Sequence, residues 1–343
     1  MILRAIDSFL GRGEAAVTVP PLDGALRPNR ALDDAASRHR LDDVDCLAVS
    51  GGQLLAAAGD SLYAFDAEGR WQRRLRAEAR ITCIDGGAIA LAGGEIRHGG
   101  RSYHIEGGCI TAMAATATML YVACGSTRHQ PDDWQLDLLH RQASGSLWQI
   151  DLASERATRL ASGLAWPAGL ALDDGGGLVF AEAWKHRLVR IDPASPGRRQ
   201  VLHGDLPGYP GRLSRAGDHY WLAIFAPRSQ LVEFVLREPA YVRRMIAEVP
   251  KPYWIAPKLR SGRSFYEPLQ GGGVKHLGLL KPWAPSLSIG LAVRLDRNFQ
   301  PVSSLHSRAD GRTHGITSAV ELGGTVYAAA RGDDVVVALE ASS

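Results

Sequence analysis

The feature that most constrains the fold is a series of short apolar runs between residues 163 and 193. Three strand-length runs, at 169–172, 178–181 and 188–191, lie close together, and the first two are separated by a turn rich in glycine and aspartate. Strands spaced this closely, with no helix between them, must pair antiparallel as a meander. We interpret this segment as one blade of a β-propeller, which predicts that similar segments recur along the chain.

The same pattern recurs at five other places. The other repeats begin near Asp45, Ile81, Cys109, Gly211 and Ile316. Their second strands are rich in alanine and valine, which suits a crowded wall near a central axis. A ring of four-stranded sheets also solves the problem of open sheet edges. The sequence therefore predicts an all-β, six-bladed β-propeller, whereas the alternative of two β-sandwiches does not account for six repeats.

Two of the six repeats are interrupted by long insertions. Residues 125–144 interrupt the third blade and contain a predicted short helix over 132–139 with an aspartate cap. Residues 226–290 interrupt the fifth blade and contain a predicted amphipathic helix over 239–249, followed by a loop with aromatic residues. Loops of this length in a compact domain are usually either functional lids or disordered, and the aromatic residues favour a lid or an interface. We expect both insertions to cap one rim of the ring.

The chain before the repeats has no clear period. We expect residues 1–40 to form an arm laid over the fold, with the option of supplying a closing strand, and residues 41–343 to form one propeller domain. The first ten residues contain Arg4 and Asp7, and their apolar stretch is too short for a signal peptide or a membrane span. We therefore expect a cytoplasmic protein, with membrane-surface contact through the N-terminus or the fifth-blade insertion as the alternative.

Charge and cysteine content exclude several classes of function. The chain has 39 Lys and Arg against 36 Asp and Glu, a net charge of +3, and no dense basic run, so no nucleic-acid partner is expected. The cysteines have neither a CxxC motif nor the spacing of a zinc site. We expect them to be small buried hydrophobic residues; they are Cys46, Cys83, Cys109 and Cys124.

Several motifs in the middle of the chain carry a family resemblance. They are 125–127, 133–134, 136–139, 145–147, 167–172, 181–184, 206–210 and 221–223. In combination they resemble the strictosidine synthase-like family, which stands beside the senescence-marker/gluconolactonase propellers. The resemblance implies a six-bladed propeller with a small-molecule site in its central channel. Relatives hydrolyse lactones, esters or phosphotriesters, usually with calcium, or carry out a metal-free Pictet–Spengler condensation.

In a propeller the first residues of each innermost strand line the channel, and aligning the six repeats identifies these residues. These positions are Asp45, Thr82, Thr111, Ala168, Gly211 with Arg212, and Thr317. Hydrolytic relatives have carboxylate and amide oxygens there as calcium ligands. Calcium takes about six to eight oxygens, which one aspartate and three threonines do not supply, and Arg212 adds a fixed positive charge. We therefore expect no cofactor and no calcium site of the relatives' kind.

The plant synthases are implied to use a glutamate as general base at the position of Thr317. A threonine cannot serve as an acid or base near neutral pH, so strictosidine synthase activity is not expected.

Two hypotheses remain for the site. In the first, the chain is a hydrolase of the lactone or ester type, or a condensing enzyme, acting on a small, partly apolar molecule. Asp45 would be its catalytic base and Arg212 would hold an anion or a developing oxyanion. In the second, the Asp45–Arg212 pair plugs the channel of a non-catalytic binding or partner-docking propeller. A raised pKa of Asp45 would favour the first hypothesis, and a paired Arg212 would favour the second.

A wider set of residues is predicted to contact the small-molecule ligand. It comprises Thr82, Thr111, Thr317, Glu182, Trp134, Trp184, Arg228 and His314. The alternative for Glu182 is a turn cap, and the alternative for His314 is ordinary packing. An aromatic cup for an apolar or cationic ligand, or simple packing of the insertions on the ring, would account for the tryptophans. These are Trp134, Trp184, Trp254 and Trp283. The sequence does not define an oligomeric state.

Overall fold

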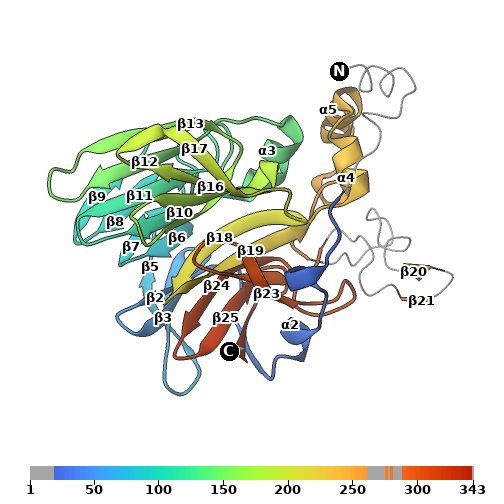
Figure 1. Ribbon diagram of the computed structural model, residues 1–343, viewed down its shortest axis with the longest axis horizontal. Helices are drawn as coiled ribbons and strands as arrows, with labels where there is room; N and C mark the ends of the chain where they lie inside the picture. Colours follow the sequence, from blue (N-terminus) through green and yellow to red (C-terminus); the bar gives the residue numbers. More distant parts are fainter. Residues whose placement is uncertain (1–18, 261–274, 277–278, 281–287, 342–343) are drawn as a thin grey trace.

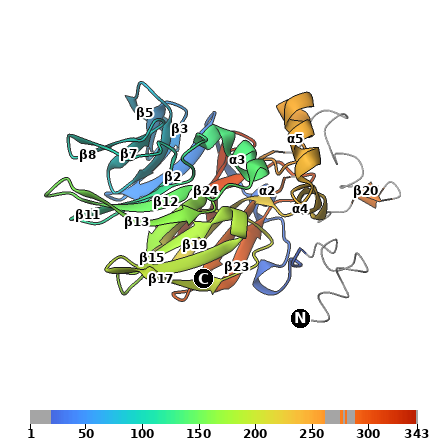
Figure 2. The same cartoon turned by 90° about the horizontal axis from the view of Figure 1, so that it is seen from above.

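The computed structural model describes residues 19–260, 275–276, 279–280 and 288–341. Within them, six four-stranded antiparallel sheets are arranged as a ring (Figures 1 and 2). The innermost strands contact one another in the cyclic order β2, β6, β10, β14, β18 and β24. The predicted six-bladed β-propeller is therefore confirmed.

The first three blades follow the chain from its inner to its outer strands. The first contains β2 (Val44–Ser50), β3 (Gln53–Ala58), β4 (Ser61–Phe65) and β5 (Trp71–Arg76). The second contains β6 (Ile81–Asp85), β7 (Ala88–Leu91), β8 (Glu95–His98) and β9 (Arg101–His104). The third contains β10 (Ile110–Ala115), β11 (Met119–Cys124), β12 (Gly145–Asp151) and β13 (Ala157–Leu164).

The last three blades complete the ring. The fourth contains β14 (Pro167–Leu172), β15 (Leu178–Glu182), β16 (Arg187–Asp192) and β17 (Ser195–His203). The fifth contains β18 (Gly208–Ala216), β19 (His219–Pro227), β22 (Leu291–Leu295) and β23 (Pro301–His306). The sixth contains β24 (Ile316–Leu322), β25 (Thr325–Ala330), β26 (Val335–Glu340) and β1 (Ser37–Arg40).

The ring is closed by a strand from the N-terminal region. Strand β1 pairs antiparallel with β26, with Ser37 opposite Ala338 and Arg40 opposite Val335. Before it, η1 (Gly24–Leu26) and α2 (Ala31–Asp34) lie against the sixth and fifth blades. Asp33 in α2 accepts the backbone N–H groups of Arg308 and Arg312, at 2.8 and 2.9 Å. Pairing β1 with β26 covers an edge that would otherwise expose unpaired backbone groups.

Burial falls from the axis outward, as expected for this architecture. In the fourth blade every residue of β15 is buried, whereas most of β17 is exposed. The small side chains of the inner strands let neighbouring blades approach closely, and apolar side chains fill the space between sheets. All four cysteines are free and buried, as expected, and burial raises the pKa of the Cys124 thiol to about 12. Such a thiol is not a nucleophile near neutral pH.

Both insertions have helices near their predicted positions. The third-blade insertion contains η2 (Pro131–Asp133) and α3 (Trp134–His140), and Asp133 makes no side-chain capping bond, contrary to the expected aspartate cap. The fifth-blade insertion contains α4 (Gln230–Val235), α5 (Pro239–Glu248), η4 (Lys251–Tyr253) and the short strands β20 (Lys275–His276) and β21 (Leu279–Leu280). Helix α5 matches the prediction to within one residue, and α4 was not anticipated.

The two insertions pack against each other over the same rim of the ring (Figure 1). Gln135 donates a hydrogen bond to the carbonyl of Pro257 at 2.7 Å, and Arg141 donates one to the carbonyl of Leu236 at 3.1 Å. Leu139 lies in an apolar cluster with Val242 and other residues of the fifth-blade insertion. The insertions thus form one lid, defined here as residues 126–144 and 228–260. None of the helices in the described part of the chain is long and apolar enough to cross a bilayer.

Candidate functional site: a lidded pocket on the propeller axis

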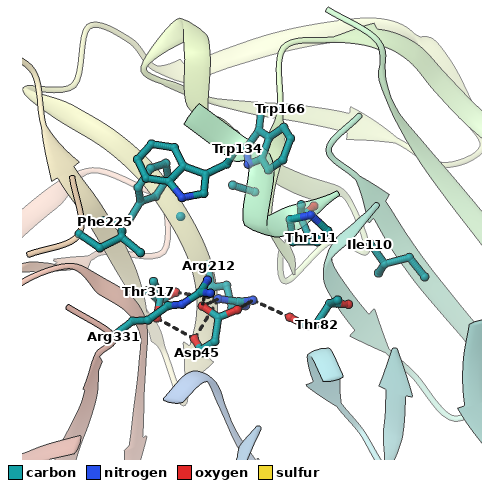
Figure 3. A pocket seen from close by; sticks show the side chains of 14 residues that line it. Asp45, Thr82, Ile110, Thr111, Trp134, Trp166, Arg212, Phe225, Thr317 and Arg331 are labelled. Atoms are coloured by element: carbon teal, nitrogen blue, oxygen red, sulfur yellow. Dashed lines mark hydrogen bonds and ion pairs between the residues drawn. The ribbon is translucent and has the colours of Figure 1, made fainter. Parts of the chain in front are cut away.

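A pocket of about 70 Å³ lies on the axis beneath the lid (Figure 3). Its floor is polar and comes from the inner strands and their ends. The floor residues are Asp45, Thr82, Thr111, Arg212, Thr317 and Arg331. Its walls are largely apolar and come from the lid and the neighbouring strand ends. The main wall residues are Ile110, Trp134, Trp166, Phe225 and Leu259. A polar floor under apolar walls is the usual composition of a small-molecule site, although the volume is below the roughly 300 to 1,000 Å³ of most such sites.

Arg212 and Asp45 form the expected ion pair at the centre of this floor. Nη1 of Arg212 lies 3.2 Å from Oδ1 of Asp45, and Nη2 lies 3.0 Å from Oδ2. The same guanidinium donates to three backbone carbonyls, those of Asp45 at 2.9 Å, Thr317 at 3.3 Å and Thr82 at 2.7 Å. These carbonyls belong to β2, β24 and β6, while Arg212 lies on β18. One side chain thus ties together strands of four blades.

Arg212 also divides the channel. A second cavity, of about 330 Å³, is lined by residues further along the inner strands, including Cys46, Cys83 and Asp85. Arg212 lines both this cavity and the lidded pocket. Its guanidinium therefore lies between the two cavities and plugs the axis of the ring.

The charges around Asp45 keep its carboxylate ionised. Burial raises the pKa of Asp45, but the positive charges of Arg212, Arg331 and Arg80 outweigh burial and hold that pKa well below its usual range. A carboxylate with both oxygens hydrogen-bonded and a low pKa is a poor proton acceptor near neutral pH. This geometry argues against Asp45 as a catalytic base. It is the paired arrangement that favours the second hypothesis.

The pair belongs to a larger network of three arginines and three aspartates. Arg331 lies 3.6 Å from Oδ1 of Asp45 through Nη1 and 2.7 Å from Oδ1 of Asp132 through Nη2. Arg80 pairs with Asp43 and also lies 3.6 Å from Asp132. Since Asp132 belongs to the third-blade insertion, these contacts latch the lid to blades one, two and six. Sequence reasoning missed Arg80 and Arg331, although each directly adjoins a strand end, before β6 and after β25.

The three predicted threonines do line the pocket, but their hydroxyl protons are already used. Thr317 donates to the carbonyl of Asp45 at 2.7 Å, and Thr111 has the carbonyls of Pro167 and Ala123 at 2.5 and 3.1 Å. Thr82 donates more weakly to the carbonyl of Ala90, at 3.5 Å. The bonds from Thr317 to Asp45 and from Thr111 to Pro167 each join two neighbouring blades. Toward a ligand these hydroxyls offer mainly acceptor lone pairs.

The aromatic wall differs from the predicted cup. Trp134 and Phe225 meet edge to face, with ring centroids 5.3 Å apart, and both line the pocket. Trp184 lies behind this wall, where it stacks on Trp166 at 5.2 Å and donates through Nε1 to Asp137 at 2.8 Å. Trp166 lines the axial pocket, whereas Trp184 does not and lies behind it.

Trp166 was not predicted as a pocket residue. Its backbone has a φ of 54°, a left-handed conformation that is rare for a bulky side chain. The structure holds this turn through hydrogen bonds from the N–H groups of Ala183 and Trp184 to the carbonyls of Trp166 and Ala165. Of the other predicted tryptophans, Trp254 is buried within the lid and Trp283 lies outside the described residues.

Three other residues that were predicted to contact a ligand do not line the axial pocket. Glu182 is fully buried and accepts hydrogen bonds from the N–H of Ala165 and from Arg187, so it secures a turn at the end of β15. Arg228 pairs with Asp205 and Glu233, which anchors α4. His314 meets Asp333 at 2.9 Å through Nδ1 and the carbonyl of Arg308 at 3.1 Å through Nε2. Each side chain is engaged in local structure.

The residues on the axis do not fit the calcium site that the family resemblance implies. Asp45 supplies the one carboxylate among the inner-strand positions of the floor, and both of its oxygens are bound by Arg212. The carbonyl oxygens of Thr82 and Thr317 face the same guanidinium. In the described ranges, no three His, Cys, Asp or Glu side chains come together in a way that would hold a metal ion. A divalent cation would have to share its oxygens with a positive charge.

The strand order and the lid define a six-bladed β-propeller with a covered pocket on its axis. A family model described as strictosidine synthase matches residues 112–191. The protein Strictosidine synthase-like 10 of Arabidopsis thaliana is 26% identical over 136 residues. That match covers 38% of this chain and 36% of the relative, so the chain matches about a third of that protein's length. These findings support the resemblance seen in the motifs: the chain is similar to strictosidine synthase-like proteins, most clearly over residues 112–191.

Solved structures are similar in fold at low sequence identity. A luciferin-regenerating enzyme has a TM-score of 0.50 at 12% identity, covering 84% of this chain and 84% of its own. Regucalcin from Agrobacterium tumefaciens, described as a calcium-binding protein, has a TM-score of 0.51 at 12% identity, covering 89% of this chain and 93% of its own. At this identity the likeness concerns the propeller fold alone.

Proposed function

We propose that this propeller binds a small, partly apolar molecule carrying an anionic group in the pocket beneath the lid, and that it does so without catalysing a reaction. The observation that carries the proposal is the pairing of aromatic walls with two arginines in the polar floor. Arg212 and Arg331 contribute two positive charges to the floor, and Asp45 contributes one negative charge. Asp132 and Asp43 also contact Arg331, so an anionic group would compete with these carboxylates for Arg331 in a site partly shielded from water.

Arg331 is the residue best placed to receive that anionic group. The guanidinium of Arg212 is directed at Asp45 and at backbone carbonyls, which use its terminal nitrogens. Arg331 makes its closest contact, at 2.7 Å, through Nη2 to Asp132. Its contacts with Asp43 and Asp45 are longer, at 3.6 Å each. The planar fork of an arginine suits a carboxylate, which can accept two parallel hydrogen bonds.

The aromatic wall selects the apolar part of the ligand. Trp134 and Phe225 are held at a fixed angle by each other, and Trp166 is held by the stack with Trp184. A flat hydrocarbon ring can pack on these faces and edges with favourable offset or edge-to-face geometry. The predicted catalytic reading, in which Asp45 is the base of a hydrolase or condensing enzyme, lacks a proton acceptor because Asp45 is held ionised and paired.

Three matched probes test the proposal, since they share one ring and differ in charge: phenylacetate, 2-phenylethanol and phenethylamine. Calorimetry and tryptophan fluorescence should show binding in the order anion, neutral, cation. Arg331→Gln should remove most of the preference for the anion, and Trp134→Ala should weaken all three probes. Arg76→Gln, at an exposed pair on the first blade, serves as the matched control. Equal or stronger binding of phenethylamine would contradict the proposal.

Turnover is measured in the same samples with an aryl ester and a simple lactone. We expect no hydrolysis above that of buffer. Hydrolysis by the wild type that is lost in Asp45→Asn, with the fold retained, would restore the enzyme hypothesis and overturn the non-catalytic one.

A further inference from the structure

Five oxygen atoms converge on the Arg212 guanidinium at the centre of the ring. They are the two carboxylate oxygens of Asp45 and the carbonyl oxygens of Asp45, Thr82 and Thr317, at 2.7 to 3.3 Å. They come from the inner strands of three blades, while Arg212 enters from a fourth. Figure 3 shows the guanidinium lying among them, with dashed lines to Asp45 and toward Thr82.

This set of oxygens has the chemistry of a cation site. A carboxylate and several backbone carbonyls are the ligands that hard cations such as Ca²⁺ take in proteins. Inner strands that direct their carbonyl oxygens at one point create a negative electrostatic potential there. A positive charge at that point is therefore stabilised. The guanidinium does this with N–H donors in a fixed plane, and it brings the charge within the chain itself.

We propose that Arg212 is a built-in cation: its guanidinium takes the place of a metal ion in the axial ring of oxygens, and its removal exposes a latent site for a hard divalent cation such as Ca²⁺. The proposal is independent of the ligand in the lidded pocket. It accounts for two features together, the single inner-strand carboxylate of the floor and the arginine that covers it.

The nearest competitor for the vacated oxygens is Arg331. Its Nη1 lies 3.6 Å from Oδ1 of Asp45, so it has a short distance to move once Arg212 is removed. Its contacts with Asp132 and Asp43 oppose that movement. The experiment therefore includes a variant in which this second charge is also removed.

The test compares thermal unfolding in chelator and in excess CaCl₂. The wild type should melt at the same temperature in both. Arg212→Ala should melt lower than the wild type in chelator, and its melting temperature should rise with the logarithm of the Ca²⁺ concentration, as linkage requires for a ligand of the folded state. Arg212→Ala with Arg331→Gln should show the larger rise. Calorimetry of the same variants should give a heat of Ca²⁺ binding that the wild type lacks.

Two further variants keep the test decisive. Arg212→Gln retains amide donors and removes the charge, so it should fold where Arg212→Ala does not and should still respond to Ca²⁺. Adding Asp45→Asn to either variant should abolish the response, because it removes the carboxylate of the site. The proposal is overturned by a Ca²⁺ response in the wild type, by a response that survives Asp45→Asn, or by no response in any folded Arg212 variant.

Discussion

Arg212 on β18 and Asp45 on β2 face each other across the propeller axis as a bidentate pair, with N–O distances of 3.0 and 3.2 Å. The pair joins the fifth blade to the first, which are not neighbours in the ring. Carbonyls of the sixth and second blades accept from the same guanidinium. The centre of the ring is thus occupied by a cross-link of the chain's own charges.

Breaking this pair from one side should strongly destabilise the protein. Asp45→Asn leaves the Arg212 charge buried without its partner, and removing one member of a buried pair costs roughly 3 to 5 kcal/mol. Urea unfolding at neutral pH measures the loss. The double variant Asp45→Asn with Arg212→Gln should recover part of it, because no uncompensated charge remains. Asp60→Asn, at an exposed pair with Arg76, should leave the midpoint unchanged.

Stability should fall as the pH is lowered from about 6.5 to about 4 because of His306. Burial lowers the pKa of His306 from 6.5 to about 4, so the folded protein keeps this imidazole neutral while the unfolded chain takes up a proton. The unfolded state therefore gains protons first, and the free energy of unfolding declines by about 3 kcal/mol across that window.

His306→Gln checks this prediction. The pH dependence between those values should flatten in the variant, while His104→Gln, at an exposed position, should retain the wild-type slope. Asp45 acts in a separate, more acidic window. Its pKa is lowered in the folded state, so its contribution is present above about pH 4 and is lost as the pH falls further toward its folded pKa. A slope in His306→Gln equal to that of the wild type would assign the effect to other groups.

Removing the contacts of Asp132 with Arg80 and Arg331 should loosen the lid without unfolding the ring. Asp132→Asn removes the charge that Arg331 contacts at 2.7 Å and Arg80 at 3.6 Å. Because Asp132 is half exposed, the loss of global stability should stay below about 1 kcal/mol. Backbone amides of α3 should exchange faster with deuterium, whereas those of β14 should not. Arg244→Gln, at the exposed pair on α5, is the control, and equal exchange of α3 in both variants would contradict the latch.

Glu182 should prove essential for stability and unimportant for the ligand. Glu182→Ala removes acceptors for the N–H of Ala165 and for Lys185 and Arg187, all within 2.9 Å. The loss of a buried acceptor and its charged partners should cost roughly 2 to 4 kcal/mol. Phenylacetate affinity, measured on the folded fraction, should change less than twofold. A large change in affinity with unchanged stability would return Glu182 to the site.

The motifs that led to the axial residues were those that repeat. Asp45, Thr82, Thr111 and Thr317 occupy equivalent places near the start of inner strands, so aligning the repeats is enough to predict that they lie together. Arg212 followed from the same alignment, and its pairing with Asp45 could be proposed because the two charges were the remaining strong ionic candidates on the axis. Local periodicity is sufficient for this because every blade repeats the same strand order.

Charged and aromatic residues at strand ends were harder to place. Glu182, Arg228 and His314 were assigned to the ligand but serve local turns and loops, whereas Arg80, Arg331 and Trp166 were overlooked. A strand-end side chain can turn toward the axis, toward a neighbouring blade or into an insertion. The direction of such a side chain depends on the conformation of the adjoining loop, such as the left-handed backbone of Trp166. Loop conformation does not repeat along the sequence, so the repeats do not predict it.

The sequence by itself determined the number of blades, the positions of the two insertions and the residues that meet on the axis, because repeated strand patterns fix which side chains are equivalent. Only the tertiary structure decided that the two insertions pack together as one lid. It also decided that three arginines surround Asp45 and that the Asp45 carboxylate stays ionised. The physical reason is that the pKa of Asp45 reflects the summed charges of Arg212, Arg331 and Arg80, which come from three different blades. Their convergence exists only once the ring has closed.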